Sequence, residues 1–146
     1  MPAFIDTNVL VYCTAADAPA KRSRARELVE RLSAAGEAVV STQVLIELFH
    51  VLTRKQKMPG AAAQALVLAC TEWPVVDSDA ALVAAAIEKS LQHRLSIWDA
   101  MVVQAALQAE AHTLYSEDLG HGQRFGALAV VNPFMGWRFA RHRCGP

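Results

Sequence analysis

Short apolar runs alternate with longer amphipathic or alanine-rich segments along most of the chain. Predicted strands cover residues 3–5, 38–40, 75–76, 112–116 and 127–133, where apolar residues cluster between turn residues. Predicted helices cover residues 17–35, 43–55, 60–72, about 80–93 and 96–111, bounded by capping residues, Pro or Gly. Short strands that alternate with helices are typical of a parallel sheet covered by helices on both faces. The sequence therefore predicts an α/β fold with a short, mainly parallel central sheet.

The boundaries of the predicted elements follow from local chemistry. Ser41 or Thr42 is expected to cap the helix at 43–55, and Ser96 the helix at 96–111. One of three polar residues at 77–79 would cap the helix that ends near residue 93. No repeat, low-complexity tract or linker divides the chain, so we expect one domain at residues 1–133. Residues 134–146 form a tail whose composition turns basic and aromatic.

Composition narrows the class of protein. The chain has 146 residues, of which 53% are hydrophobic, enough for one domain with a sizeable core. Its three cysteines are far apart and form no CxxC pair, which argues against a disulfide framework or a zinc ribbon. The longest uninterrupted apolar run, residues 80–87, is far too short to span a bilayer. Asp6 interrupts the only apolar run near the N-terminus, so no signal peptide is predicted and a cytoplasmic protein is expected.

Four acidic residues are predicted to reach one edge of the sheet. Asp6 directly follows the first apolar run, where a buried and unpaired carboxylate would be strongly unfavourable. Glu47 lies in the second turn of the helix that follows the second run. Asp99 lies in the first turn of SIWDAMVVQAAL, and Asp118 follows the run TLYS. Ligand sites of open parallel sheets form beyond the carboxyl ends of the strands, so all four side chains can point to the same rim.

Three of these residues also have an ordinary structural explanation. An aspartate in the first turn of a helix often only complements the helix dipole, which would account for Asp99. Glu47 belongs to a polar stripe with spacings of three or four, and a solvated helix face explains such a stripe equally well. That stripe comprises Gln43, Glu47, His50 and Arg54. Asp118 lies in SEDLGHG, which has ordinary turn composition. Only Asp6, which a hydrophobic strand delivers, is hard to explain in this way.

The joint occurrence of the four carboxylates favours a metal site. Carboxylates that converge without an interleaved Lys or Arg repel one another, unless a cation neutralises them. Hard oxygen ligands without Cys or His select Mg²⁺ or Mn²⁺. Such an ion characteristically polarises a phosphoryl oxygen and activates water for in-line attack.

Four segments resemble the blocks of a known family. In order along the chain, they are FIDTNVLVY, STQVLIELFHVL, IWDAMVVQAA and LYSEDLGHGQ. Together they are similar to the PIN-domain family, and most of all to its bacterial VapC-type ribonuclease toxins. The resemblance places the family's acidic quartet on Asp6, Glu47, Asp99 and Asp118. It places a small polar residue on Thr7 and a hydroxyl on Ser116, which would orient ligands or waters, with Asn8 beside them.

The resemblance also implies an architecture, an activity and partners. It implies a three-layer α/β/α sandwich, Mg²⁺-dependent cleavage of RNA with Mn²⁺ able to substitute, homodimers, and neutralisation by an antitoxin protein. The tail after Pro133 does not belong to the shared pattern.

The net charge of the chain becomes informative when the four acidic residues of the predicted site are left out. The chain carries 14 acidic and 14 basic residues, so the 10 remaining acidic residues leave an excess of +4, the right sign for a polyanionic substrate. Basic side chains interleaved with aromatic ones suit single-stranded RNA, although a solvated helix face and a frayed tail explain them equally well. The candidate RNA contacts are Arg54 and Lys55, after Glu47 on its helix, and Arg138 and Arg141 in the tail.

These observations predict a metal-dependent endoribonuclease, the toxin of a toxin–antitoxin pair. Asp6, Asp99 and Asp118 would hold the metal directly, and Glu47 would act through water or as the base. Two alternatives stay open. One is a non-catalytic RNA- or protein-binding module on the same fold. The other is a phosphatase or phosphotransfer domain with Asp6 as nucleophile, which would need a second aspartate where the chain has Asn8.

Overall fold

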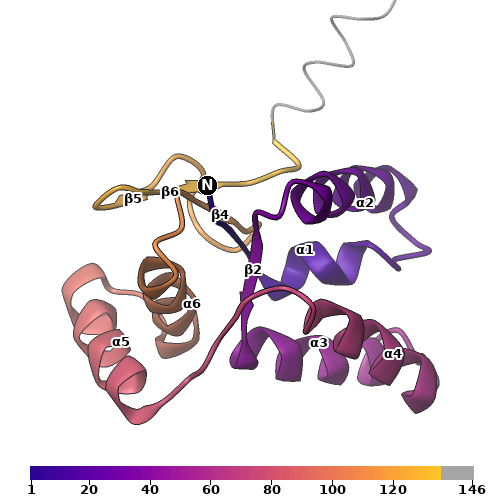
Figure 1. The fold of residues 1–146 in the computed structure, drawn as a ribbon, viewed down its shortest axis with the longest axis horizontal. Coiled ribbons are helices and arrows are strands. Elements are labelled where there is room, and N and C mark those ends of the chain that lie inside the picture. The colour runs from indigo at the N-terminus through magenta and orange to yellow at the C-terminus, as the bar shows by residue number, and fades with distance from the viewer. Residues whose placement is uncertain (136–146) are drawn as a thin grey trace, which may run out of the picture.

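The computed structural model describes residues 1–135 as six helices and a six-stranded sheet (Figure 1). The strands are β1 (Ala3–Ile5), β2 (Ala38–Ser41), β3 (Val75–Val76), β4 (Thr113–Tyr115), β5 (Arg124–Phe125) and β6 (Leu128–Val131). The helices are α1 (Thr7–Tyr12), α2 (Pro19–Ala34), α3 (Thr42–Arg54), α4 (Gly60–Cys70), α5 (Ala80–His93) and α6 (Ile97–Gln108). The strand order is β3-β2-β1-β4-β6-β5, and every pair is parallel except β5–β6.

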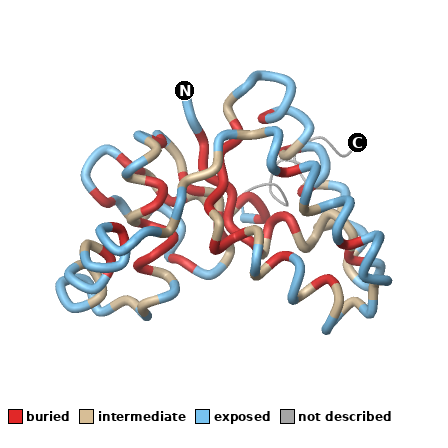
Figure 2. The backbone as a smooth tube through the Cα atoms, turned by 60° about the horizontal axis from the view of Figure 1, so that its bottom comes forward, coloured by how far each residue is buried: buried red, intermediate tan, exposed pale blue. Residues whose placement is uncertain are grey.

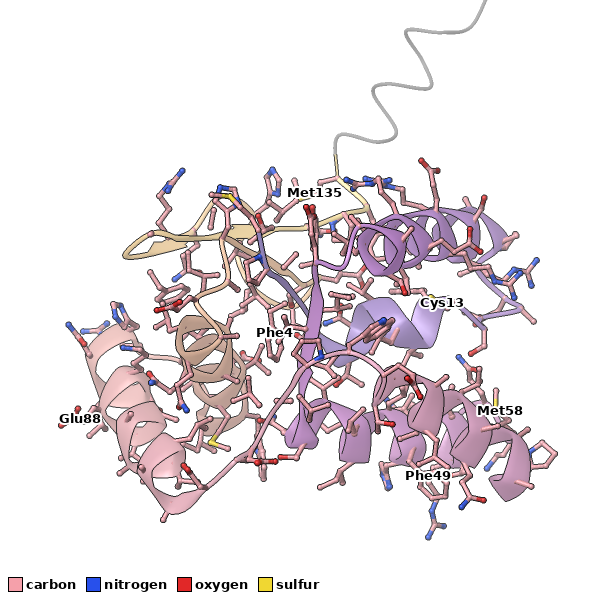
Figure 3. All side chains as sticks on the ribbon, viewed as in Figure 1. Phe4, Cys13, Phe49, Met58, Glu88 and Met135 are labelled. Carbon is pink, nitrogen blue, oxygen red and sulfur yellow. The ribbon has the colours of Figure 1, made fainter. Side chains whose placement is uncertain are left out.

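The helices form two layers around this sheet. Figure 1 shows α1 to α4 on one side and α5 with α6 on the other. In Figure 2 the buried residues concentrate in the central strands, and the exposed ones on the outer turns of the helices. Phe4 on β1 is fully buried, whereas Phe49 on α3 points away from the core and is 43% exposed (Figure 3). The predicted three-layer α/β/α sandwich is confirmed.

The caps that begin three helices come from short polar side chains. Ser41 Oγ accepts a hydrogen bond from the Val44 N–H at the start of α3, and Asp79 Oδ1 accepts one from Leu82 N–H at the start of α5. Ser96 caps α6 in the same way. Each cap satisfies an N–H group that has no partner within its helix. The structure therefore confirms Ser96, and selects Ser41 and Asp79 from the candidates.

Two elements were not predicted from the sequence. The helix α1 begins directly after β1 and uses Asp6 as its N-cap, so the chain turns into a helix without a loop. The two-residue strand β5 forms a tight hairpin with β6, in which Gly126 has a φ of +61°, a conformation that glycine adopts without strain. Both elements are too short to produce a periodic pattern.

The topology brings the ends of two distant strands together. The chain runs from β1 toward β2 and β3 on one side, then returns through α5 and α6 to β4 on the other side of β1. The Asp6 N–H donates to the Tyr115 carbonyl at 3.0 Å, so the carboxyl ends of β1 and β4 lie side by side. A crevice for ligands forms where the strand order reverses in this way. Within residues 1–135, no helix is long and apolar enough to cross a membrane.

Candidate active site

The structure brings the four predicted carboxylates to this edge of the sheet. Asp6 follows β1, Glu47 lies in the second turn of α3, Asp99 in the first turn of α6, and Asp118 after β4. The charges of Asp118 and Glu47 both act to raise the pKa of Asp6 and of Asp99, because like charges disfavour ionisation. The four side chains therefore share one electrostatic site, although they come from four separate elements.

Asp6 is the most buried member, with only 5% of its surface exposed. Its Oδ1 accepts a hydrogen bond from the Thr7 N–H at 2.7 Å, and its Oδ2 accepts one from the Ser116 hydroxyl at 2.8 Å. Burial raises the pKa of Asp6 from 3.8 to about 6; the two hydrogen bonds oppose this shift, and the neighbouring carboxylates add to it. Two hydrogen bonds thus fix the orientation of the Asp6 carboxylate, in an environment that disfavours its negative charge.

Asn8 connects two of the carboxylates. Its amide nitrogen lies 3.2 Å from Asp6 Oδ2, 3.0 Å from Asp118 Oδ2 and 3.4 Å from Ser116 Oγ. The orientation of the amide is set from the other side, because its oxygen accepts the Glu117 N–H at 3.1 Å. Asn8 therefore aims its donor group between Asp6 and Asp118, and links the loop after β4 to α1.

Both carboxylate oxygens of Glu47 accept hydrogen bonds from neighbouring side chains. The Thr7 hydroxyl donates to Oε2 at 3.1 Å, and the Gln43 amide donates to Oε1 at 2.8 Å. The polar stripe expected on α3 is therefore not uniformly solvated. Gln43 is buried, at 9% exposure, whereas His50 and Arg54 are exposed.

Asp99 does not need to act as the cap of its helix, because Ser96 has that role. The Asp99 N–H donates to Ser96 Oγ at 3.1 Å, which is the capping hydrogen bond of α6. Partial burial raises the pKa of the Asp99 carboxyl, and the charges of Asp118 and Glu47 add to this rise, while a hydrogen bond with Ser96 opposes it. Capping of α6 therefore does not account for Asp99.

The chemistry of the donor set fits a hard divalent cation. Within residues 1–135, no Lys, Arg or His forms an ion pair with any of the four carboxylates. In the same residues, no three His, Cys, Asp or Glu side chains are gathered closely enough to enclose an ion. The carboxylate oxygens instead accept hydrogen bonds from Thr7, Asn8, Ser116 and Gln43. Three properties of the four carboxylates therefore suit a hard divalent cation. They offer oxygen donors, they repel one another, and the most buried of them, Asp6, has no basic partner among residues 1–135.

A cleft of about 470 Å³ opens beside the carboxylates, between α1 and α3. Thr7, Asn8, Glu47 and Asp118 line one part of it, and Tyr12, Lys55 and Gln56 are among the residues that line the rest. A second cavity of about 460 Å³ shares Lys55 and Gln56 with the cleft and reaches Lys57 and Pro59. Lys55 therefore lines the cleft that the acidic residues also reach, and its contact with RNA stays a prediction. Arg54 does not line the cleft, and Arg138 and Arg141 lie outside the described residues.

A polar cluster next to the site was not predicted. Lys21 Nζ lies 2.7 Å from Glu117 Oε2, and the Tyr12 hydroxyl donates to Glu117 Oε1 at 2.8 Å. The Lys21 ammonium also lies over the rings of Tyr12 and Phe134. Glu117 adjoins Asp118 in sequence, but its carboxylate is directed to this cluster. No sequence pattern reveals the pair, because Lys21 and Glu117 are 96 residues apart.

The comparisons with known proteins agree with this geometry. The sequence profile of the PIN domain matches residues 3–123, most of the chain. The chain belongs to the PIN-domain family, as its four sequence blocks predicted. A search of curated proteins gave no match.

The solved structures that resemble the chain include toxins of toxin–antitoxin pairs. VapC20 of Mycobacterium tuberculosis, described as a toxin that cleaves the sarcin–ricin loop, is 25% identical, and the match covers 80% of this chain and 89% of VapC20 with a TM-score of 0.64. A toxin–antitoxin complex from Klebsiella pneumoniae is 16% identical, with 90% and 98% covered and a TM-score of 0.67. VapBC2 from Rickettsia felis, bound to a DNA fragment from their promoter, is 20% identical, with 89% and 97% covered and a TM-score of 0.62. The last two similarities concern the fold alone.

Proposed function

We propose that the protein is a metal-dependent endoribonuclease and the toxin of a VapBC-type toxin–antitoxin pair. The observation that carries the proposal is the convergence of Asp6, Glu47, Asp99 and Asp118 at one sheet edge of a PIN-domain protein, without a basic partner among the described residues. A structural cluster of this size would need cationic side chains to offset the repulsion. The resemblance to VapC20 supports RNA as the substrate class.

The resident ion would be Mg²⁺, with Mn²⁺ able to substitute. Asp6, Asp99 and Asp118 would hold it, and Glu47 would contribute through water or accept the proton of the attacking water. When bound, the ion lowers the pKa of that water and stabilises the charge that grows on the phosphate. Thr7, Asn8 and Ser116 orient the carboxylates of Asp6, Glu47 and Asp118 by the hydrogen bonds described above. The acidic side chains would still have to move closer together to enclose an ion.

The cleft beside the carboxylates would receive the RNA. Lys55 would supply a cation for a backbone phosphate, and Tyr12 and Gln56 line the same cleft, with their polar groups already hydrogen-bonded within the protein. Arg54 lies one residue before Lys55 on the exposed end of α3, where it would contribute to the field over the cleft. The tail residues Arg138 and Arg141 stay predictions. Such a ribonuclease would act in the cytoplasm, where cellular RNA is accessible.

The enzymatic proposal is tested by cleavage of a structured RNA by the purified protein. We expect cleavage with Mg²⁺ or Mn²⁺ and none with EDTA. Asp6→Asn should abolish cleavage, because it removes an anionic ligand with little change in volume. Asp77→Asn, at an exposed loop position, is the matched control and should cleave like the wild type. Undiminished cleavage by Asp6→Asn would refute the mechanism. A wild type that binds RNA without cutting it would support the non-catalytic alternative.

An antitoxin is the partner that the structural neighbours support. The structures from Klebsiella pneumoniae and Rickettsia felis are toxin–antitoxin assemblies. We expect a segment of the antitoxin to cover the acidic rim and to present a basic side chain to it. An apolar cavity of about 380 Å³, lined by Leu10, Leu48, Leu52 and Trp73 among others, lies beside α1 and would accept an apolar part of the same partner. Co-expression with the neighbouring reading frame should yield a stable complex without ribonuclease activity, and a toxin that stays active and unbound would refute this.

We also propose that the protein is a homodimer. The helix α5 presents Val83, Ile87 and Leu91 at intervals of four residues, and these side chains are 37%, 48% and 79% exposed. An exposed apolar stripe of this kind marks an interaction surface. Light scattering after gel filtration should give twice the monomer mass of 15.8 kDa, and Ile87→Glu should give a folded monomer. A wild-type monomer at all concentrations would contradict the proposal.

A further inference from the structure

Gln43 is one of five buried polar or charged residues among residues 1–135, and its residue type alone indicates no role in the site. It is the second residue of α3 and is 9% exposed. We propose that Gln43 is a positioning residue that ties the candidate base Glu47 to the start of α6, the segment that carries Asp99. This inference rests on the proposed function of the carboxylate site.

A single nitrogen atom makes both connections. Gln43 Nε2 donates to Glu47 Oε1 at 2.8 Å and to the Trp98 carbonyl at 3.3 Å. The first bond joins residues one turn apart on α3, and the second joins residues that are 55 positions apart. A primary amide has two N–H groups, and both are used here. Because Trp98 directly precedes Asp99, the second bond fixes α3 against the turn that carries Asp99.

The chemistry of an amide suits this position. Glu47 and Asp99 repel each other, and the charge of Glu47 helps to raise the pKa of Asp99. A neutral donor can hold the Glu47 side chain in place against this repulsion. It leaves the negative charge of Glu47 available to a metal ion. A lysine would neutralise that charge, and an apolar residue would leave Glu47 Oε1 and the Trp98 carbonyl without this donor. The Thr7 hydroxyl is likewise neutral and binds the other oxygen of Glu47 at 3.1 Å.

Local stability does not explain the arrangement. The N-terminus of α3 is already capped by Ser41, and the Thr42 hydroxyl donates to Ser78 Oγ at 3.0 Å, which attaches α3 to the loop after β3. Gln43 therefore is not needed to start its helix or to anchor it. Its distinctive contact is with Glu47 and with the residue before Asp99.

The main test uses Gln43→Met, which keeps the length of the side chain and removes both donors. Gln92→Met, at an exposed position on α5, is the matched control. We expect Gln43→Met to lower kcat about 10- to 100-fold, the usual effect of losing a group that orients a ligand. KM for RNA should stay within about 2-fold, because Gln43 is buried and does not line the cleft. Gln92→Met should leave both constants unchanged.

A second measurement needs no catalysis. Thermal melts are recorded at increasing Mn²⁺ concentrations, and the Mn²⁺ midpoint is the concentration that gives half of the maximal rise in melting temperature. This midpoint should be about 10-fold higher in Gln43→Met than in the wild type. In a Glu47→Gln background the same substitution should add no further shift, because Gln43 acts through Glu47. Gln43→Ala, which leaves room for a water in place of the amide, should show a smaller change in the same direction and serves if the Met variant does not fold.

The outcomes separate this inference from the proposed function. A Gln43→Met protein with the kcat and Mn²⁺ midpoint of the wild type would overturn the inference while cleavage stands. A raised KM with unchanged kcat would also overturn it, since Gln43 would then contact the RNA. If the wild type cleaves no RNA, the proposed activity fails, and the Mn²⁺ midpoints still decide whether Gln43 positions Glu47.

Discussion

The burial of Asp6 predicts that the metal-free protein loses stability as the pH rises. The pKa of Asp6 is about 6 in the folded protein, against 3.8 for an unperturbed aspartate. The folded state therefore keeps a proton that the unfolded chain has already released. Between these two values the stability falls, and above pH 6 the loss is complete. Below pH 3.8 the contribution of Asp6 is fully favourable.

The size of the effect follows from the two pKa values. The difference between 3.8 and about 6 corresponds to roughly 3 kcal/mol, at about 1.4 kcal/mol for each pKa unit. Solvent does not screen this contribution strongly, since only 5% of Asp6 is exposed. Such a value is a large part of the total stability of a small domain, which is typically about 5–15 kcal/mol.

The assay compares urea unfolding of the wild type and Asp6→Asn in EDTA, from pH 4 to pH 7. Groups far from the site titrate alike in both proteins, so the difference in unfolding free energy reports the titration of Asp6 together with its coupling to Glu47 and Asp118. We expect this difference to change by up to about 3 kcal/mol in favour of the variant as the pH rises. Mg²⁺ should offset most of this loss in the wild type, because an ion at 100 times its Kd adds about 2.7 kcal/mol. A difference that is constant with pH would refute the reasoning.

Three further predictions concern other residues of the site. Asp99→Asn should stabilise the protein in EDTA by about 1 kcal/mol, abolish cleavage and reduce the stabilisation by Mg²⁺; a lower melting temperature in EDTA would indicate that the Asp99 charge mainly complements the dipole of α6. Lys21→Met and Glu117→Gln should show a coupling of about 0.5–1 kcal/mol in a double-mutant cycle of stability, with the Mg²⁺ shift retained in each. Lys55→Ala should raise KM for RNA and lower the salt dependence of binding by about 0.7 in slope, whereas Arg31→Ala, on the exposed end of α2, should change neither. Fluorescence anisotropy across a salt series measures the last effect, and an unchanged slope would contradict it.

Long elements with caps were predictable from the sequence, and short ones were not. The helix α6 was expected because Ser96 precedes an apolar segment of helical composition, and the structure places the cap there. The helix α1 has six residues and begins at a residue that already ends a strand. Its existence depends on packing against α2 and α3, which no local pattern records.

The candidate site was likewise predictable from the sequence only in part. The rule that ligand sites lie beyond the carboxyl ends of parallel strands was enough to bring Asp6 and Asp118 together. The hydrogen bonds that orient them were not predictable, because Asn8 reaches Asp118 across 110 positions and Gln43 reaches Trp98 across 55. The spacing of Gln43 and Glu47 fitted a solvated stripe equally well. Only the position of α6 decides that Gln43 is buried.

The place of β4 in the sheet has a consequence for the growing chain on the ribosome. The strands β1, β2 and β3 are neighbours and are made first, so one edge of β1 can pair early. The other edge stays open until residues 113–115 have left the ribosome, and β4 itself lies between β1 and the still later β6. Asp118 and the Ser116 hydroxyl that holds Asp6 arrive with β4. A chain released before this point lacks one of the four carboxylates, so a protein with this topology assembles its acidic site only after residue 118 has been synthesised.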